Sequence, residues 1–126
     1  MNNAVRKYGL WALKIIAGLA FLAAGLAKLA GAEMMVATFD AVGVGQWFRY
    51  VTGLIEVGAA LVLFIPGIQA FGATLLTATM IGAALAHIVV LGTDTMLPSI
   101  VLGAFSAIIA YAHRDQLPIV GTKAVG

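Results

Sequence analysis

The chain has no cysteine, and only 10% of its 126 residues are charged. The absence of cysteine excludes thiol–disulfide exchange, cysteine-ligated iron–sulfur clusters and cysteine zinc sites. The charged fraction is far below the roughly 25% of an average soluble domain. Any redox chemistry would therefore need a cofactor that the chain binds. The low charge is typical of a membrane protein.

What the chain has in excess is apolar sequence, with 63% hydrophobic residues and a mean hydropathy of +1.08. A transmembrane helix needs about 20 predominantly apolar residues to cross roughly 30 Å of hydrocarbon. Four runs approach or reach this length, and none alternates apolar and polar residues as a barrel strand does. We predict an all-α membrane domain over residues 1–126, a four-helix bundle that spans the bilayer at residues 8–30, 47–67, 71–91 and 97–112.

Basic residues lie near both ends of the chain and predict its orientation. Arg6, Lys7 and Lys14 precede or begin the first run, and Arg114 and Lys123 follow the last. The positive-inside rule then places both termini in the cytoplasm, which suits an even number of spans. We expect a multi-pass protein of the bacterial inner membrane with the lipid bilayer as its partner. The basic residues form no cluster of the kind that binds nucleic acid.

A short amphipathic helix is predicted in the outward-facing segment between the first two spans. Helical spacing places one polar and one apolar face there, and Gly43 is expected to end the helix. The polar face carries Glu33, Ala37 and Asp40, and the apolar face carries Met35, Phe39 and Val42.

The first run carries a stripe of small residues with a lysine at each end. Lys14, Gly18, Phe21, Gly25 and Lys28 follow one another at steps of four, three, four and three, which places all five on one face. Small residues on such a face let membrane helices approach closely. We interpret it as a packing seam whose two lysines snorkel toward the membrane surfaces.

Glu56 lies in the middle of an otherwise apolar run. A charge at membrane depth costs about 2.5–3.5 kcal/mol on insertion scales, so it usually has a partner and marks function. Arg49 and Thr52 lie on the same side of this helix. Arg49 and Glu56 are two turns apart, so Lys28, a water or a ligand must lie between them.

Three segments together resemble the DoxX-like family of small bacterial membrane proteins. They are residues 18–29 (GLAFLAAGLAKL), 49–59 (RYVTGLIEVGA) and 84–87 (ALAH), and the resemblance runs from about residue 18 to residue 114. It implies a four-helix inner-membrane protein with Lys28, Arg49, Glu56 and His87 as its characteristic polar positions. The founding relatives are associated with quinone-linked thiosulfate oxidation, so the resemblance also implies a quinone as a possible ligand.

These four residues are the candidate ligand-binding or proton-relay site, which we expect in the outer half of the bundle. Three interpretations of this site remain open. It could be a structural ion pair between Glu56 and Lys28 or Arg49, a pocket for a quinone headgroup, another small molecule or a proton, or a contact with a partner chain. Thr52 is a supporting residue, and so is Asp94, which either caps the last helix or is solvated. We expect no metal site and no covalently bound cofactor.

Three functions fit this sequence. The chain could be an accessory subunit of a quinone-linked redox system, a small proton-coupled transporter or channel, or an assembly protein that packs against a partner or its own copies. The first is favoured, mostly by the resemblance, and an accessory role is favoured over that of an autonomous enzyme.

Overall fold

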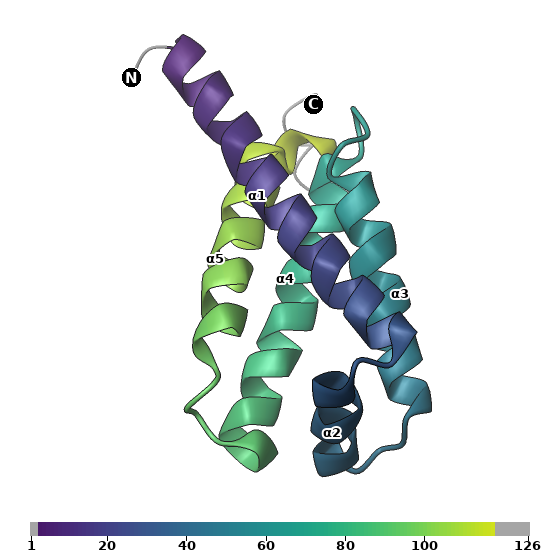
Figure 1. Cartoon of the computed structure of the whole chain (residues 1–126). Helices are drawn as coiled ribbons and strands as arrows, with labels where there is room; N and C mark the ends of the chain where they lie inside the picture. The colour runs from purple at the N-terminus through teal and green to yellow at the C-terminus, as the bar shows by residue number, and fades with distance from the viewer. Residues whose placement is uncertain (1–2, 118–126) are drawn as a thin grey trace.

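The computed structural model describes residues 3–117, which form helices joined by short links, with no strand among them (Figure 1). Five α-helices, one π-helical turn and one 3₁₀ turn follow one another, which confirms the predicted all-α class. The elements are α1 (Asn3–Ala30), α2 (Glu33–Val42), α3 (Trp47–Val62), α4 (Gln69–Ala86), η1 (His87–Leu91), α5 (Leu97–Ala112) and η2 (Arg114–Gln116).

The short helix α2 lies where the sequence predicts it. Gly43 follows it with a φ of 83°, a left-handed conformation that glycine adopts without the penalty of a Cβ atom. The Gly43 amide donates to the Phe39 carbonyl and closes the helix. Phe39 is the buried residue of α2, and it packs edge-on against Phe48 of α3.

Three predicted boundaries differ from those of the structure. The second run was expected to be helical over 47–67, but α3 ends at Val62 because Pro66 cannot continue a helix and disfavours helical geometry before it. The third run begins earlier, at Gln69, and its last turn widens into the π-helix η1 at His87. The helix of the first run also begins earlier than predicted, at Asn3.

The four long helices pack as neighbours, α1 against α3, α3 against α4, α4 against α5, and α5 against α1. In Figure 1, α1 crosses the others diagonally and its first turns extend past the end of α5. The first turns of α1 and η2 lie at one end of the molecule, and α2 and the link before α5 lie at the other. Lys123, on which the predicted orientation partly rests, is outside the described residues.

Within the described chain, two helices are long and apolar enough to cross a membrane, Asn3–Ala30 and Gln69–Leu91. Leu97–Ala112 is a shorter apolar helix. Large apolar side chains cover much of the exterior, including Leu19, Leu54 and Val89. Such a surface suits a hydrocarbon environment, because contiguous exposed apolar patches this extensive are rare on soluble monomers.

The core between the helices is built from small and medium-sized side chains. Its fully buried members come from all four long helices, and they include Phe21, Leu63, Leu76 and Ile109. The ring of Phe64 lies against Gly18, where a Cβ atom would stand only 2.5 Å from the ring. The stripe on α1 is therefore a packing seam, as predicted.

Helices α1 and α3 come into backbone contact at two glycines. A Cβ atom on Gly25 would lie 2.9 Å from the Gly53 carbonyl oxygen and 2.7 Å from Val57 Cγ2. A Cβ atom on Gly53 would lie 3.0 Å from the Gly25 carbonyl oxygen. Neither helix could carry a larger residue at this crossing without moving away from the other.

The crossing predicts the effect of adding one methyl group. We expect Gly25→Ala to destabilise the protein by about 1–3 kcal/mol, because the added carbon overlaps the backbone of α3. Gly9→Ala on the same helix is the matched control, since nothing lies within 4 Å of its added carbon. Thermal unfolding in mild detergent measures both; equal midpoints for the two variants would contradict the close approach.

Candidate functional site

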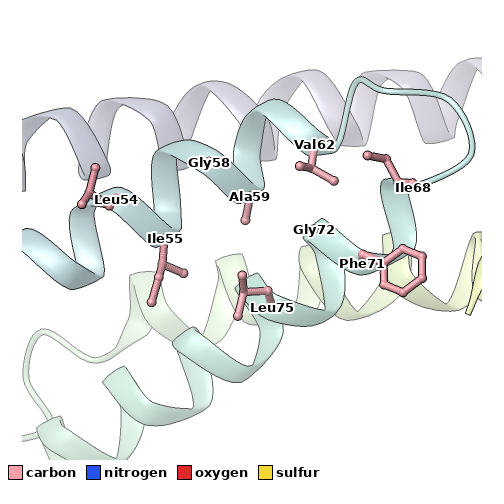
Figure 2. Close-up of a pocket in the computed structure, with 9 residues that line it drawn as sticks. All are labelled: Leu54, Ile55, Gly58, Ala59, Val62, Ile68, Phe71, Gly72 and Leu75. Carbon is pink, nitrogen blue, oxygen red and sulfur yellow. The ribbon is translucent and has the colours of Figure 1, made fainter.

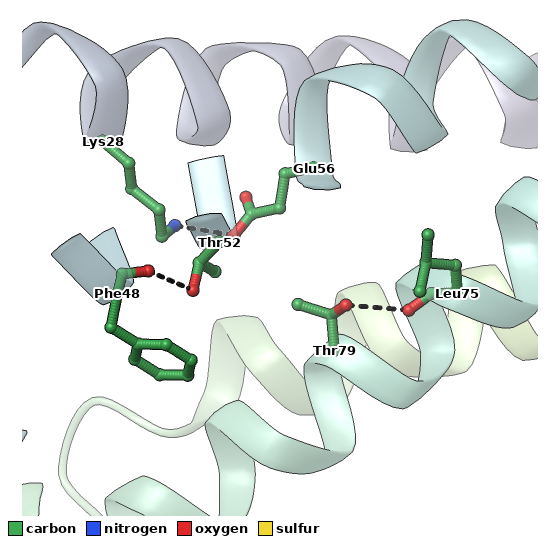
Figure 3. Close-up of polar contacts among 6 residues, drawn as sticks. All are labelled: Lys28, Phe48, Thr52, Glu56, Leu75 and Thr79. Carbon is green, nitrogen blue, oxygen red and sulfur yellow. Dashed lines mark hydrogen bonds and ion pairs between the residues drawn. The ribbon is translucent and has the colours of Figure 1, made fainter. Parts of the chain in front are cut away.

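The site is centred on an ion pair between α1 and α3. The Lys28 ammonium nitrogen lies 2.8 Å from Glu56 Oε1, and Figure 3 shows the lysine extending from α1 to meet the carboxylate. The Gly25–Gly53 crossing explains this reach. Lys28 leaves α1 with its Cβ beside Gly53, and Glu56 is one turn further along α3. The glutamate is 1% exposed, and the lysine side chain is 12% exposed.

Arg49 approaches the same lysine from the other side. It is 5% exposed at the start of α3, and its guanidinium donates to the backbone carbonyl of Lys28 and, at 2.7 Å, to the side-chain oxygen of Gln46. A cation at the last turn of α1 is stabilised by the carbonyls there that lack a helical partner. Arg49 therefore binds the end of α1 through the Lys28 carbonyl, while Glu56 binds the ammonium of the same lysine.

Among residues 3–117, no hydrogen bond joins the other candidate residues to this pair. The Thr52 hydroxyl donates to the Phe48 carbonyl of its own helix at 2.8 Å (Figure 3). His87 Nδ1 is 2.9 Å from the Ala83 carbonyl, and no contact in the described chain joins its ring to the ion pair. Asp94 is exposed and makes no cap to α5, whose N-cap position is Met96. The capping alternative for Asp94 is therefore wrong.

One atom of the pair has no partner. Within residues 3–117, Glu56 Oε1 is in ionic contact with Lys28, but Oε2 accepts from no donor although it is fully enclosed. Buried polar atoms are nearly always hydrogen-bonded, so such an atom needs an explanation. This oxygen could accept a hydrogen bond from a water or a bound group, or it could carry a proton and donate one.

A separate groove between α3 and α4 has a volume of about 460 Å³ (Figure 2). Leucine, isoleucine, valine, alanine, glycine and phenylalanine residues line it, among them Leu54, Ile55 and Phe71. None of these side chains could orient a polar headgroup. The groove therefore forms no part of the candidate site. No three histidine, aspartate or glutamate side chains of residues 3–117 come together as metal ligands.

A family model for the DoxX-like family matches residues 12–109. The chain belongs to the DoxX-like family. This membership and the two helices of membrane-spanning length and composition indicate a membrane protein. Comparisons with curated proteins and with solved structures give no significant match. The family match covers all four candidate residues, Lys28, Arg49, Glu56 and His87.

A second polar cluster, which the sequence interpretation did not predict, joins the middle of α1 to the end of α5 in this DoxX-like protein. Lys14 is 3% exposed, so the prediction that it snorkels is wrong. Its ammonium lies 3.4 Å from His113 Nε2 and 4.2 Å from the centre of the Trp11 ring. The position of Lys14 on the buried glycine stripe was a signal for this, because that face points toward the other helices.

His113 continues the cluster into η2 and α4. Its Nδ1 is 3.5 Å from Gln116 Nε2, which donates to Gln69 Oε1 at 2.7 Å. Burial, and to a lesser degree the charge of Lys14, lower the pKa of His113 below its ordinary value of 6.5, while Asp115 opposes the shift. The shift disfavours the charged imidazolium.

Breaking the ion pair on one side should cost more than removing both charges. We expect Lys28→Met to destabilise the protein by about 3–5 kcal/mol, because it leaves a buried carboxylate unpaired. Adding Glu56→Gln to that variant should recover much of the loss. Denaturant titration in detergent measures the cycle, with exposed Glu33→Gln as the control expected to stay within about 0.5 kcal/mol. Strictly additive losses would contradict a coupled pair.

The lowered pKa of His113 predicts a loss of stability in acid. The unfolded chain binds a proton on this residue at a higher pH than the folded chain does, so the stabilisation is complete above about pH 6.5 and falls below it. We expect the thermal midpoint to drop between about pH 7.5 and about pH 5.5, and to drop less in His113→Gln. His87→Gln serves as the matched histidine control and should keep the wild-type pH dependence.

Proposed function

We propose that this DoxX-like protein is a multi-pass inner-membrane accessory subunit that binds a small lipophilic molecule at the Lys28–Glu56 pair, with the quinone headgroup as the chemical class. In this proposal the four long helices form a bundle that crosses the membrane with both termini in the cytoplasm. The ring of contacts from α1 through α3, α4 and α5 back to α1 supports the bundle.

The observation that carries the proposal is the enclosed Oε2 atom of Glu56, which has no hydrogen-bond partner among residues 3–117 and lies beside a cation. The Lys28 ammonium has three N–H donors, and its contact with Glu56 occupies one of them. The pair thus offers a free donor and a free acceptor side by side in an apolar setting. A quinone carbonyl can accept from Lys28, and the hydroxyl of the corresponding quinol can donate to Glu56.

The lysine is the accessible member of the pair. Its side chain keeps 12% of its surface exposed, while the glutamate keeps 1%. A ligand would therefore meet the ammonium first, and Arg49 would hold the end of α1 in place while it binds. The chain has no cysteine to exchange electrons with such a ligand, so electron transfer would be carried by the ligand and a partner protein.

A purified-protein titration with a short-chain quinone analogue and with its quinol tests this function. We expect the affinity for both to fall at least about tenfold in the Lys28→Met/Glu56→Gln double variant, since each lost charge-assisted hydrogen bond contributes about 1.5–3 kcal/mol. Because this variant removes both charges of the pair, its loss of binding would not reflect one charge left without its partner.

Two controls sharpen the titration. Glu33→Gln removes an exposed carboxylate and should bind as the wild type does, and so should His87→Ala, whose ring has no contact with the pair. Absence of binding by the wild type, or wild-type affinity in the double variant, would overturn the proposal and leave the pair as a structural link between α1 and α3.

A further inference from the structure

The cluster around Lys14 has more hydrogen-bond donors than acceptors. Among residues 3–117, no carboxylate lies within ion-pair distance of Lys14, although the side chain is 3% exposed. Its nearest polar partner is His113 Nε2 at 3.4 Å, which occupies at most one of its three N–H donors. A buried ammonium without an anion is costly, and it differs in this from Lys28, which has Glu56.

The neighbouring amide makes the shortage of acceptors worse. The Gln116 side-chain oxygen accepts from the Ala70 amide at 2.9 Å, which fixes the orientation of the group and turns its nitrogen toward Gln69 and His113. A neutral imidazole has one acceptor nitrogen. With Lys14 charged, His113 faces a donor on both sides and can accept from only one of them.

The cluster also lies at the boundary marked by the end of α5. The contact with His113, directly after α5, places Lys14 level with the end of that helix. From Lys14 to Ala30, α1 rises about 25 Å, which matches the roughly 24 Å of the sixteen-residue α5. The earlier turns of α1 extend beyond this level (Figure 1). Lipid headgroups lie at such a boundary.

The surroundings are basic. Residues 3–14 and 113–117 carry Arg6, Lys7, Lys14 and Arg114 against a single acidic residue, Asp115. Arg6, Lys7 and Arg114 are exposed, and the Arg114 guanidinium lies 4.1 Å from the centre of the Tyr111 ring. A basic site between membrane helices at headgroup level is the kind that binds anionic lipid headgroups.

We propose that Lys14 and His113 form a binding site for a phosphate group, supplied by the headgroup of an anionic phospholipid. The phosphate oxygens provide the acceptors that the cluster lacks and the negative charge that Lys14 needs. The exposed Arg6, Lys7 and Arg114 draw the lipid to this end of the molecule without specifying the site. The site shares no residue with the Lys28–Glu56 pair and stands independently of the function proposed for it.

Native mass spectrometry of the full chain in mild detergent tests the proposal, by titration with phosphatidylglycerol and with zwitterionic phosphatidylcholine. We expect phosphatidylglycerol to bind in preference, and its affinity to fall about tenfold in Lys14→Gln, which loses a charge-assisted contact to the phosphate. His113→Asn should lower the affinity severalfold. Lys7→Gln removes the same charge from an exposed position on the same helix and should change the affinity less than twofold.

A parallel titration with inorganic phosphate, without lipid, separates the two sources of the anion. Phosphate binding that depends on Lys14 would show that the phosphate group alone is recognised; binding of phosphatidylglycerol alone would show that the membrane delivers it. Equal affinity for the two lipids, or an equal loss in Lys7→Gln and Lys14→Gln, overturns the proposal. Should Lys14→Gln not fold, His113→Asn decides: wild-type affinity in that variant overturns the proposal too.

Discussion

The backbone contact between α1 and α3 at Gly25 and Gly53 is the constraint on which the rest of the structure depends. It removes the space that side chains would otherwise fill between two antiparallel helices. A helix separation this small lets the lysine one turn from Gly25 reach the glutamate one turn from Gly53. The ion pair thus depends on two glycines at the crossing, since any larger side chain there would separate the helices.

Lys28 connects three features through two of its own groups. Its carbonyl accepts from Arg49 at the end of α1, and its ammonium meets Glu56 in the interior. The hydrogen bond from Arg49 and the ion pair with Glu56 therefore both hold Lys28. A lysine held in this way has little freedom to turn its ammonium toward solvent. Glu56 keeps one oxygen, Oε2, that has no hydrogen-bond partner in the described chain.

The two ends of the glycine stripe on α1 have opposite imbalances of hydrogen-bond donors and acceptors. Near Lys28 the unpaired atom is an acceptor, the Oε2 of Glu56, whereas near Lys14 the surplus is in donors. The free acceptor on Glu56, with the Lys28 cation beside it, suits a ligand that can both donate and accept hydrogen bonds. The donors around Lys14 suit an anion. One glycine-rich face of one helix thus presents two sites of different chemistry, separated by about 21 Å of helix rise.

Much of this could be read from the sequence, because hydrophobic runs, glycine turns and helical spacing act locally. Composition and periodicity determined the all-α class, the short helix before the second span, and the face of α1 that packs inward. They also singled out Lys28, Arg49 and Glu56 and required something between the last two. The end of α3 at Val62 and the start of α4 at Gln69 were predicted wrongly, because the apolar sequence continues through the turn at Pro66.

Only the tertiary structure decided which polar side chains meet. Spacing along one helix says nothing about register between helices, and the Gly25–Gly53 contact sets that register. In the folded chain Glu56 pairs with Lys28, whereas His87 and Thr52 bond to carbonyls of their own helices. Lys14 is buried against His113, which is 99 residues away in the chain. The sequence by itself determined which residues are exceptional in an apolar chain; long-range packing determined their partners, because partnership depends on distances that no local pattern encodes.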